Sequence, residues 1–274
     1  MDANLGNRVV VVTGASGGIG SAIARAFVSE GARVVLHFHR SRSAARKLQV
    51  QLGKGALALG ADLTKEAQTR RFFAQVMARF GKIDTLIANA GSWVDEEIPL
   101  HNLSLKQWRQ TLDQVLTSTF LSVREFLRAV QRQRRGNLVL VGSTAAIFGE
   151  AGHADYASAK AAIAFGMTRT LKNEIARIAP HTAKYCGGRV NCICPGWTAI
   201  PRTAYKLKKS SSIRKVTATM ALPQIARPED IANAAVFLSS DTLARHMTGQ
   251  TVVIAGGMEG RVLWEADEID PRIA

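Results

Sequence analysis

Hydrophobic and polar positions alternate between two kinds of run along nearly the whole chain. Short continuous runs of apolar, mostly β-branched residues are typical of strands that are buried on both faces of a parallel sheet. Amphipathic stretches with helical periodicity lie between them. The apolar runs predict strands at 8–13, 33–38, 56–59, 83–88, 137–141, 189–193 and 251–254. The amphipathic stretches predict helices at 19–30, 43–52, 64–80, 104–131, 154–178 and 228–239, with Thr64 and Ser104 as N-caps.

Strands that alternate with helices predict βαβ crossovers. We therefore expect an α/β fold with a single Rossmann-type, doubly wound, mostly parallel seven-stranded sheet flanked by helices. The 274 residues, 47% hydrophobic and 21% charged, suit one globular domain with a large core. No repeat or linker divides the chain, so we expect one domain over 1–274, with a core at 8–260, a substrate loop at about 197–224 and a C-terminal tail at 261–274.

Composition narrows the class of protein further. No apolar run approaches the roughly 18 residues that a membrane helix needs, and the polar N-terminus lacks the apolar segment of a secretory signal. We therefore expect a cytoplasmic protein without membrane contact. The cysteines, Cys186, Cys192 and Cys194, have neither the number of a disulfide framework nor the spacing of a structural zinc site. We expect buried thiols and no metal, with Cys194 the one to test for reactivity because it adjoins Pro195 at a strand end.

The formal net charge is +15, which bears on partners rather than on fold. It points to an acidic carrier protein, a phosphorylated or carboxylated substrate, or nucleic acid. Basic residues gather in two stretches that we interpret as solvated surface: Arg124, Arg128, Arg132, Arg134 and Arg135, and then Arg202, Lys206, Lys208, Lys209, Arg214 and Lys215. Because no nucleic-acid recognition motif accompanies them, we expect no specific nucleic-acid binding, and strongly salt-dependent binding would argue otherwise.

A glycine-rich segment follows the first predicted strand and opens the first predicted helix. Residues 13–20 read TGASGGIG, with glycines at 14, 17, 18 and 20. Glycines let the backbone turn sharply and approach a pyrophosphate closely, and a helix N-terminus supplies free N–H groups and a positive dipole end. In this strand–turn–helix context the segment predicts a dinucleotide-binding site.

The end of the second strand bears on which dinucleotide binds. A site for NAD places Asp or Glu there, to accept a hydrogen bond from the ribose 2′-hydroxyl. Here Phe38 stands at that place, and Arg40 and Ser41 follow. A guanidinium and a hydroxyl can hold a 2′-phosphate instead, so we expect NADP(H). The alternative is that Arg40 and Ser41 are surface residues at a strand end.

Three side chains have the chemistry for proton transfer. Tyr156 and Lys160 lie four residues apart in a predicted helix and therefore share one face. The pKa of free tyrosine is about 10, and a nearby ammonium should lower it, which would make Tyr156 a general acid/base. Ser143 follows the fifth strand, where it can hydrogen-bond a substrate oxygen. We expect Ser143, Tyr156 and Lys160 to be catalytic in an oxidoreductase that transfers a hydride between a nicotinamide and a carbonyl or secondary alcohol.

Together these motifs resemble the short-chain dehydrogenase/reductase family, in particular its 3-oxoacyl-[acyl-carrier-protein] reductase-like members. TGASGGIG, Asp62 in ADLT, Asn89-Ala90-Gly91, Ser143, Tyr156-x-x-x-Lys160, Pro195-Gly196 and Gly256-Gly257 occur in the family's order between about residues 8 and 260. The resemblance implies an NADP(H) cofactor and a homotetramer or homodimer formed through the two long helices. The cofactor contacts that it implies are Gly14, Ser16, Gly17, Gly18, Ile19, Gly20, Arg40, Ser41, Asp62, Leu63, Asn89, Ala90, Gly91, Tyr156, Lys160, Pro195, Gly196 and Thr198.

Within that set the resemblance assigns parts of the cofactor to particular segments. Asp62 and Leu63 would contact the adenine, and residues 89–91 the adenosine ribose. Lys160 would hold the nicotinamide ribose. The nicotinamide itself would meet Pro195, Gly196 and Thr198.

Two positions depart from the family pattern. Gly17 stands where many NADP-dependent relatives carry a basic residue. Val115 stands at the usual Asn of the long helix, which helps to hold a water for proton relay, so Gln114 or Thr117 would have to substitute or the relay would change. Val115 motivates an alternative, namely a non-catalytic or weakly active NADP(H)-binding protein.

The substrate remains open at this point. Trp93, His153, Trp197 and the loop beyond Pro201 neighbour the catalytic segments, so we expect them to border the substrate, with His153 as a structural bystander. Aromatic residues make up only 6% of the chain, so we expect no flat aromatic pocket. The substrate is expected to be a small carbonyl or alcohol, either anionic or carrier-bound. Acyl thioesters, pteridines, sugars, polyols, steroids and small ketones all stay open.

Overall fold

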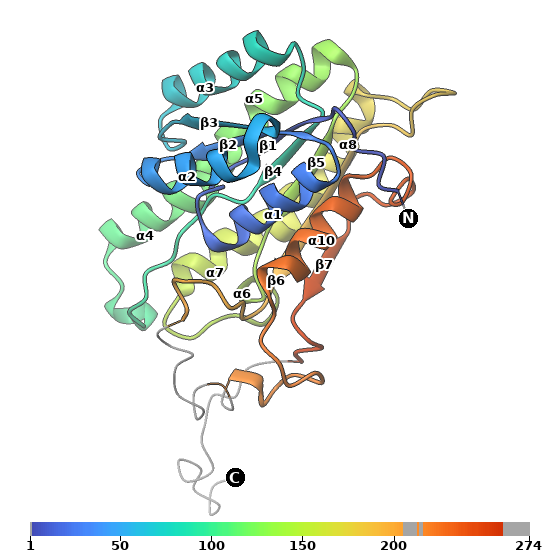
Figure 1. The fold of residues 1–274 in the computed structure, drawn as a ribbon. Coiled ribbons are helices and arrows are strands. Elements are labelled where there is room, and N and C mark those ends of the chain that lie inside the picture. The colour runs from blue at the N-terminus through green and yellow to red at the C-terminus, as the bar shows by residue number, and fades with distance from the viewer. Residues whose placement is uncertain (1, 205–212, 214–215, 260–274) are drawn as a thin grey trace, which may run out of the picture.

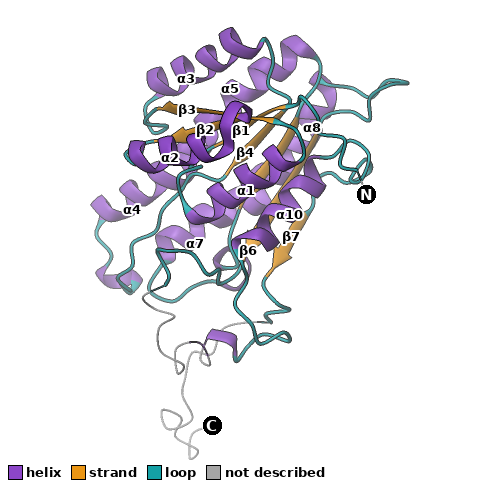
Figure 2. Cartoon of the chain, viewed as in Figure 1, coloured by secondary structure: helices purple, strands orange, loops and turns teal. Residues whose placement is uncertain are grey.

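The fold is a three-layer arrangement in a computed structural model that describes residues 2–204, 213 and 216–259. A seven-stranded sheet of order β3-β2-β1-β4-β5-β6-β7 forms the middle layer (Figure 2). Every pair of neighbouring strands is parallel, which confirms the predicted doubly wound α/β fold. The strands are β1 (Val9–Val12), β2 (Arg33–Phe38), β3 (Ala56–Gly60), β4 (Thr85–Ala88), β5 (Asn137–Val141), β6 (Arg189–Pro195) and β7 (Thr251–Ile254).

Helices cover both faces of the sheet (Figure 1). One hydrophobic cluster packs α1, α2 and α10 against one face, with Phe27 and Ile23 of α1 fully buried. The other cluster packs α3, α5 and α8 against the opposite face around Phe72 and Phe126. The helices are α1 (Gly18–Ser29), α2 (Arg42–Leu52), α3 (Glu66–Phe80), α4 (Leu105–Leu112), α5 (Ser118–Gln133), α6 (Ala145–Phe148), α7 (Ala154–Ala161), α8 (Thr168–Ile178) and α10 (Pro228–Ser239).

The two long predicted helices are each interrupted by a wider helical turn. A π-helical segment, Asp113–Thr117, separates α4 from α5, and another, Ala162–Met167, separates α7 from α8. Hydrophobic periodicity alone does not reveal such a turn, because the flanking helical segments keep their apolar faces toward the same core. The first of these segments contains Val115, at the place of the family's usual Asn.

One predicted N-cap is confirmed and the other is wrong. Ser104 Oγ accepts a hydrogen bond from the N–H of Gln107 at 3.2 Å, as a helix cap does. Thr64 does not cap α3, which begins at Glu66. Instead the hydroxyl of Thr64 donates to the carboxylate of Asp62 at 2.7 Å, and its N–H donates to the same oxygen at 3.0 Å. The competing Asp62 side chain therefore turns the chain before the helix starts.

The cysteines are partly or fully buried, as expected. Cys192 and Cys194 lie on the same side of β6, their Sγ atoms 4.0 Å apart, and neither side chain is exposed. In the described ranges, no group of three or more His, Cys, Asp or Glu side chains could hold a metal ion. No helix in those ranges is long and apolar enough to cross a membrane.

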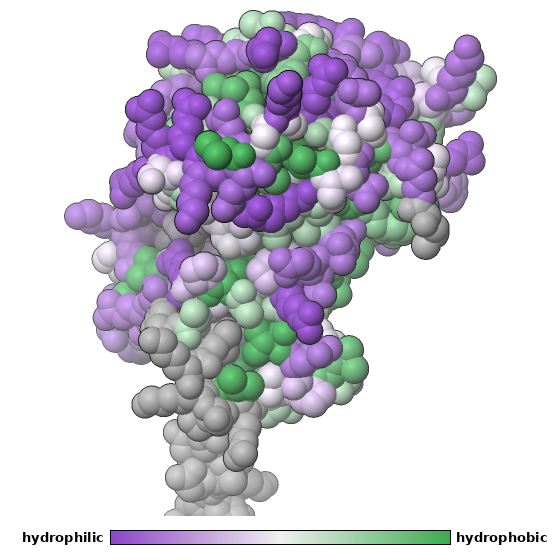
Figure 3. Space-filling view, viewed as in Figure 1, coloured by the Kyte–Doolittle hydropathy of each residue, from purple (hydrophilic) through white to green (hydrophobic). Residues whose placement is uncertain are grey.

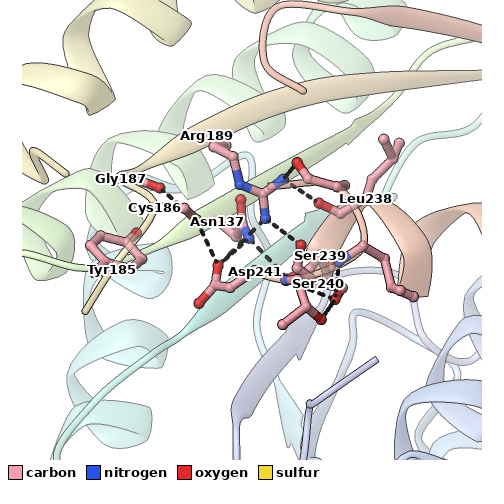
Figure 4. A network of polar contacts seen from close by, with 12 residues as sticks. Asn137, Tyr185, Cys186, Gly187, Arg189, Leu238, Ser239, Ser240 and Asp241 are labelled. Carbon is pink, nitrogen blue, oxygen red and sulfur yellow. Dashed lines mark hydrogen bonds and ion pairs between the residues drawn. The ribbon is translucent and has the colours of Figure 1, made fainter. Parts of the chain in front are cut away.

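A cluster of charged side chains lies at the amino ends of the strands, on the side of the sheet opposite their carboxyl ends. Figure 4 shows the guanidinium of Arg189, at the start of β6, between Asp241 and the backbone of the segment after α10. Arg189 is only 3% exposed and donates to the carbonyls of Leu238, Ala244 and Ser240 at 2.8–3.0 Å. Asp241 also accepts from Arg8 at 2.9 Å and from Arg135 at 2.6 Å. We call Arg8, Arg135, Arg189 and Asp241 the Asp241 cluster.

The basic stretch along α5 is ion-paired rather than only solvated. Arg124 contacts Glu66 of α3 at 2.7 Å, and Arg128 contacts Glu125 at 2.8 Å. Hydrophilic residues cover most of the upper face of the molecule in Figure 3. Of the second basic stretch, Lys206, Lys208, Lys209, Arg214 and Lys215 lie outside the described residues, as does the tail at 261–274.

Candidate active site

The carboxyl ends of β1, β4, β5 and β6 surround a cavity of about 310 Å³. Its wall is formed in part by the glycine-rich residues 13–20, which we call the glycine turn. The segments after β4 and β6, Ser143 and α7 form the rest of it. The predicted site residues that line it are Gly14, Gly17, Gly18, Ile19, Gly20, Asn89, Ala90, Gly91, Ser143, Tyr156, Lys160, Pro195, Gly196 and Thr198. Five others, Ser16, Arg40, Ser41, Asp62 and Leu63, are not among its lining residues, but they follow β1, β2 and β3 at the same edge of the sheet.

The glycine turn depends on the absence of side chains at two positions. Gly14 has a φ of +65°, which favours glycine. A Cβ on Gly20 would come within 2.3 Å of the carbonyl oxygen of Gly14, so α1 could not approach the turn this closely with any other residue. The turn therefore carries the N-terminus of α1 into the cavity wall, where it can meet an anionic group.

Asn89 and Thr13 tie the glycine turn to the end of β4. Asn89 Nδ2 donates to the carbonyl of Thr13 at 2.9 Å and lies 3.4 Å from that of Gly14. Thr13 Oγ1 in turn accepts from the N–H groups of Asn89 and Ala90, both at 2.9 Å. The resemblance assigned Asn89 to the adenosine ribose, whereas its amide nitrogen here holds the turn in place.

His37 is a site residue that the sequence reasoning missed. It is buried in β2, and its Nδ1 accepts from the N–H of Gly14 at 3.1 Å. Nε2 must then carry the proton, and it donates to the carbonyl of Ala61 at 3.0 Å. Burial lowers the pKa of His37 to about 4, so the ring is neutral at neutral pH. The ring therefore joins the glycine turn to the segment after β3. In the sequence, the only indication of this role was a single histidine within an otherwise apolar predicted strand.

Ser143, Tyr156 and Lys160 converge on one wall of the cavity. Ser143 follows β5 and lies beside Tyr156 of α7, where its hydroxyl acts to lower the pKa of the phenol. Lys160 Nζ donates to the carbonyl of Val141, the last residue of β5, at 2.7 Å. The same Nζ lies 5.8 Å from the centre of the Tyr156 ring. The end of β5 thus anchors Lys160 and carries Ser143, and the two side chains lie on the same cavity wall as Tyr156.

The predicted direction of the Tyr156 pKa shift is wrong for this structure. Burial raises the pKa of Tyr156 to about 12, although the hydroxyl of Ser143 acts in the opposite direction. Burial also lowers the pKa of Lys160 to about 8. Desolvation outweighs the effects of Ser143 and Arg202, which act to lower the pKa of Tyr156, and a phenol in this site stays protonated at neutral pH.

Val115 and Lys160 both approach Gly91 in the cavity wall. A Cβ on Gly91 would sit 3.7 Å from Lys160 Nζ and 3.8 Å from a methyl of Val115. Of the two substitutes considered, Thr117 donates to Asp113 at 3.2 Å on an exposed part of the helix. Gln114 Oε1 accepts from the hydroxyl of Ser92, a cavity residue, at 2.6 Å. Gln114 is therefore the polar group of this helix that reaches the cavity wall.

An aromatic cluster lines part of the cavity, contrary to the expectation from composition. The Trp93 ring stacks on His153 with centroids 5.1 Å apart, and lies 6.0 Å from Tyr156 and 6.3 Å from Trp197. Trp93, Tyr156 and Trp197 line the cavity. A low overall aromatic content does not limit how many aromatic side chains the fold brings to one place.

The segment after β6 covers the glycine turn. A Cβ on Gly18 would come within 2.5 Å of the Ile200 side chain, so this segment packs directly on the start of α1. Arg202 donates to the carbonyl of Trp93 and lies 3.8 Å from the carboxylate of Asp95. Thr198 is 4% exposed, and its hydroxyl donates to the carbonyl of Gly196 at 3.0 Å. Of these side chains, only Thr198 belongs to the predicted cofactor contacts.

Comparison with known proteins agrees with this arrangement. A family model described as Enoyl-(Acyl carrier protein) reductase matches residues 14–259. The chain is 30% identical to a 3-oxoacyl-[acyl-carrier-protein] reductase of Synechocystis over 92% of its length and 96% of the relative's. It is 32% identical to 3-oxoacyl-[acyl-carrier-protein] reductase FabG of Vibrio cholerae (93% and 98%), and 34% identical to cis-4-hydroxycyclohexanecarboxylate dehydrogenase of Sinomonas cyclohexanicum (91% and 96%). Motifs, strand order and full-length similarity agree, and the chain belongs to the short-chain dehydrogenase/reductase family of oxidoreductases.

Proposed function

We propose that this protein is an NADP(H)-dependent reductase that transfers a hydride between nicotinamide and a carbonyl or secondary alcohol. The observation that carries the proposal is the convergence of Ser143, Tyr156 and Lys160 in the cavity that the glycine turn also lines. Proton donors that adjoin a dinucleotide cradle suit hydride transfer, because reduction of a carbonyl leaves an alkoxide that needs a proton.

The described residues fit a nicotinamide cofactor. Gly18 and Gly20 line the cavity, and the N-terminus of α1 offers N–H groups there to a pyrophosphate. When bound, the cofactor supplies the hydride. Ser143 then orients the substrate oxygen by a hydrogen bond, and Tyr156 donates its phenolic proton to that oxygen. Lys160 would hold the nicotinamide ribose of a bound cofactor and would stabilise the phenolate that results.

The preference for NADP(H) rests on the end of β2. Arg40 and Ser41 are exposed there, beyond Phe38, where a carboxylate would favour NAD. Asp62, at the end of the neighbouring β3, lies 3.8 Å from the ring of His39 and is hydrogen-bonded by Thr64. These contacts leave the guanidinium of Arg40 as the strongest ligand for a 2′-phosphate.

Arg40→Ala is expected to raise the KM for NADPH by about tenfold and to leave the KM for NADH nearly unchanged. A charge-assisted hydrogen bond to a phosphate contributes roughly 1.5–3 kcal/mol. NADH lacks the 2′-phosphate, so it makes no such bond with Arg40 and its binding is unaffected. Steady-state kinetics with both cofactors measures the effect. Arg42→Ala, at the first residue of α2, is the matched control. An equal loss with both cofactors would contradict the NADP(H) preference.

His37→Leu is expected to weaken NADPH binding by about tenfold, because it removes both ring hydrogen bonds that hold the glycine turn, each worth about 0.5–1.5 kcal/mol. His37→Gln retains a donor for Ala61 and should recover part of the affinity. Titration of the intrinsic fluorescence with NADPH measures the Kd. An unchanged Kd in the Leu variant would show that the turn keeps its shape without the ring.

Two substrate classes are consistent with the relatives and the charge. A net charge of +15 suits an anionic substrate or an acyl group on an acidic carrier protein. Two of the relatives act on 3-oxoacyl groups of a carrier protein, and the third on a hydroxycyclohexane carboxylate, by their names. A homotetramer or homodimer and a cytoplasmic location belong to the proposal as well. A monomer mass in light scattering would contradict the first of these.

The second candidate is a non-catalytic NADP(H)-binding protein, which the apolar Val115, at the family's usual Asn position, favours. An assay that follows the loss of NADPH absorbance over a panel of linear, cyclic and thioester carbonyls separates the two. Turnover supports the reductase. Tight NADPH binding with no turnover on the whole panel would favour the binding protein.

A further inference from the structure

The side chain of Trp93 is held in place beside Tyr156, the predicted proton donor. One face of its indole stacks on His153, with 28° between the ring planes. Both nitrogens of His153 face backbone carbonyls, Nε2 at 3.0 Å from that of Val94 and Nδ1 at 3.3 Å from that of Ala151. His153 is 3% exposed, so these contacts leave the ring little freedom.

The segment that carries Trp93 is anchored at a second place. The N–H of Ile98 donates to the carbonyl of Gly152 at 2.9 Å. Glu97 packs against Gly152 so closely that a Cβ there would come within 2.7 Å of it. The segment and the turn before α7 therefore form one unit, and Trp93 keeps a fixed distance from Tyr156.

Two indoles line the cavity together with Tyr156. Trp93 lies 6.0 Å from the Tyr156 ring, and Trp197 meets Trp93 edge to face, at 6.3 Å and 76°. Arg202 joins the segment after β6 to Trp93 and Asp95 at the rim. Preorganised flat surfaces bind a compact apolar ring at little entropic cost, whereas a flexible chain loses rotational freedom there and covers less of each surface.

We infer that the substrate carbonyl is part of a ring, and that the ring packs on Trp93 while its oxygen meets Tyr156 and Ser143. This inference rests on the proposed reductase function and narrows it to cyclic ketones and cyclic secondary alcohols. In reduction, the hydride of NADPH forms the new C–H bond at the ring carbon and the phenolic proton of Tyr156 passes to the oxygen. NADP⁺ and a cyclic alcohol result. Trp93 determines specificity, and His153 is its positioning residue.

The experiment compares kcat/KM for cyclohexanone and hexan-2-one, which have equal carbon number, and for an acetoacetyl thioester. The wild-type protein should prefer the ring by about tenfold or more, the factor that roughly 1.4 kcal/mol of aromatic contact supplies. Trp93→Leu should bring the ratio of ring to linear ketone close to one, mainly through the KM of cyclohexanone. Trp93→Phe should keep most of the preference. Trp108→Leu, on α4 and not among the residues that line the cavity, is the control.

The outcomes separate this inference from the function on which it rests. Turnover that favours hexan-2-one or the thioester, or a ring preference that Trp93→Leu leaves intact, overturns the ring inference and leaves the reductase standing. Binding of cyclohexanol and hexan-2-ol to the NADP⁺ complex is measured as well, by ligand-observed NMR. If cyclohexanol does not bind preferentially and no carbonyl of the wider panel is turned over, the ring inference and the reductase function are overturned together.

Discussion

Tyr156→Phe is expected to lower kcat for carbonyl reduction by about a thousandfold, with little change in the Kd for NADPH. The substitution removes the only atom of this side chain that can give a proton to the substrate oxygen, and general acid catalysis contributes roughly 10² to 10⁴ to a rate. The ring remains, so packing against Trp93 and stability should be nearly unchanged. The assay is the loss of NADPH absorbance with the best carbonyl of the panel.

Burial of Tyr156 also determines how the rates of reduction and oxidation depend on pH. Because its pKa is raised to about 12, the phenol is protonated throughout the neutral range and is ready to act as an acid. Reduction should therefore need no prior ionisation, whereas oxidation of an alcohol needs the phenolate and should accelerate as pH rises. Measuring both directions from neutral to alkaline pH tests this.

Tyr185→Phe is the matched control for the tyrosine substitution. Tyr185 lies at the amino end of the sheet, where its hydroxyl donates to the carbonyl of Gly136, and its pKa is also raised to about 12 by burial. Its replacement should leave kcat unchanged. Retention of more than a tenth of the activity in Tyr156→Phe would contradict the proposed role of Tyr156.

Asp241→Asn is expected to destabilise the protein by about 3 kcal/mol, the typical cost of breaking a largely buried ion pair, and to lower Tm by on the order of 10 °C. Asp241 is the shared acceptor of Arg8, Arg135 and the buried Arg189. An amide in its place leaves Arg135 and the buried Arg189 without a counter-charge, whereas Arg8 keeps the carboxylate of Asp84 at 3.3 Å. Denaturant unfolding gives the free energy, and Glu174→Gln, at an exposed position of α8, should change it by no more than about 0.5 kcal/mol.

The same cluster makes stability depend on pH in a defined direction. Burial alone would raise the pKa of Asp241, but the hydrogen bond from Arg135 and the charges of Arg8, Arg135 and Arg189 outweigh it and lower the pKa. A carboxyl with a depressed folded-state pKa contributes stability that is complete above its unfolded pKa of about 3.9 and is lost as pH falls through the folded value. The difference between wild type and Asp241→Asn should therefore be constant near neutrality and shrink below about pH 4. A difference that grows on acidification would contradict this account.

Local sequence by itself determined the layers of the fold and the position of its main motif. The apolar runs of β1, β2 and β5 and the amphipathic pattern of α1 and α10 predict buried strands and covering helices, because burial on a regular element repeats at that element's own period. The glycine turn and the spacing of Tyr156 and Lys160 are equally local. Each lies within a few residues, so its geometry follows from a turn or from one face of a helix.

Tertiary structure decided what depends on burial and on residues far apart in the chain. His37 joins Gly14 to Ala61 only because three strands end side by side. Trp93, His153 and Trp197 meet only after the segments that follow β4, β5 and β6 converge. The pKa of Tyr156 rises rather than falls because desolvation in the folded core exceeds the opposing effects of Ser143 and Arg202. Spacing identifies which groups can meet, whereas their solvation and their distant neighbours determine what they do, and only the folded chain specifies these.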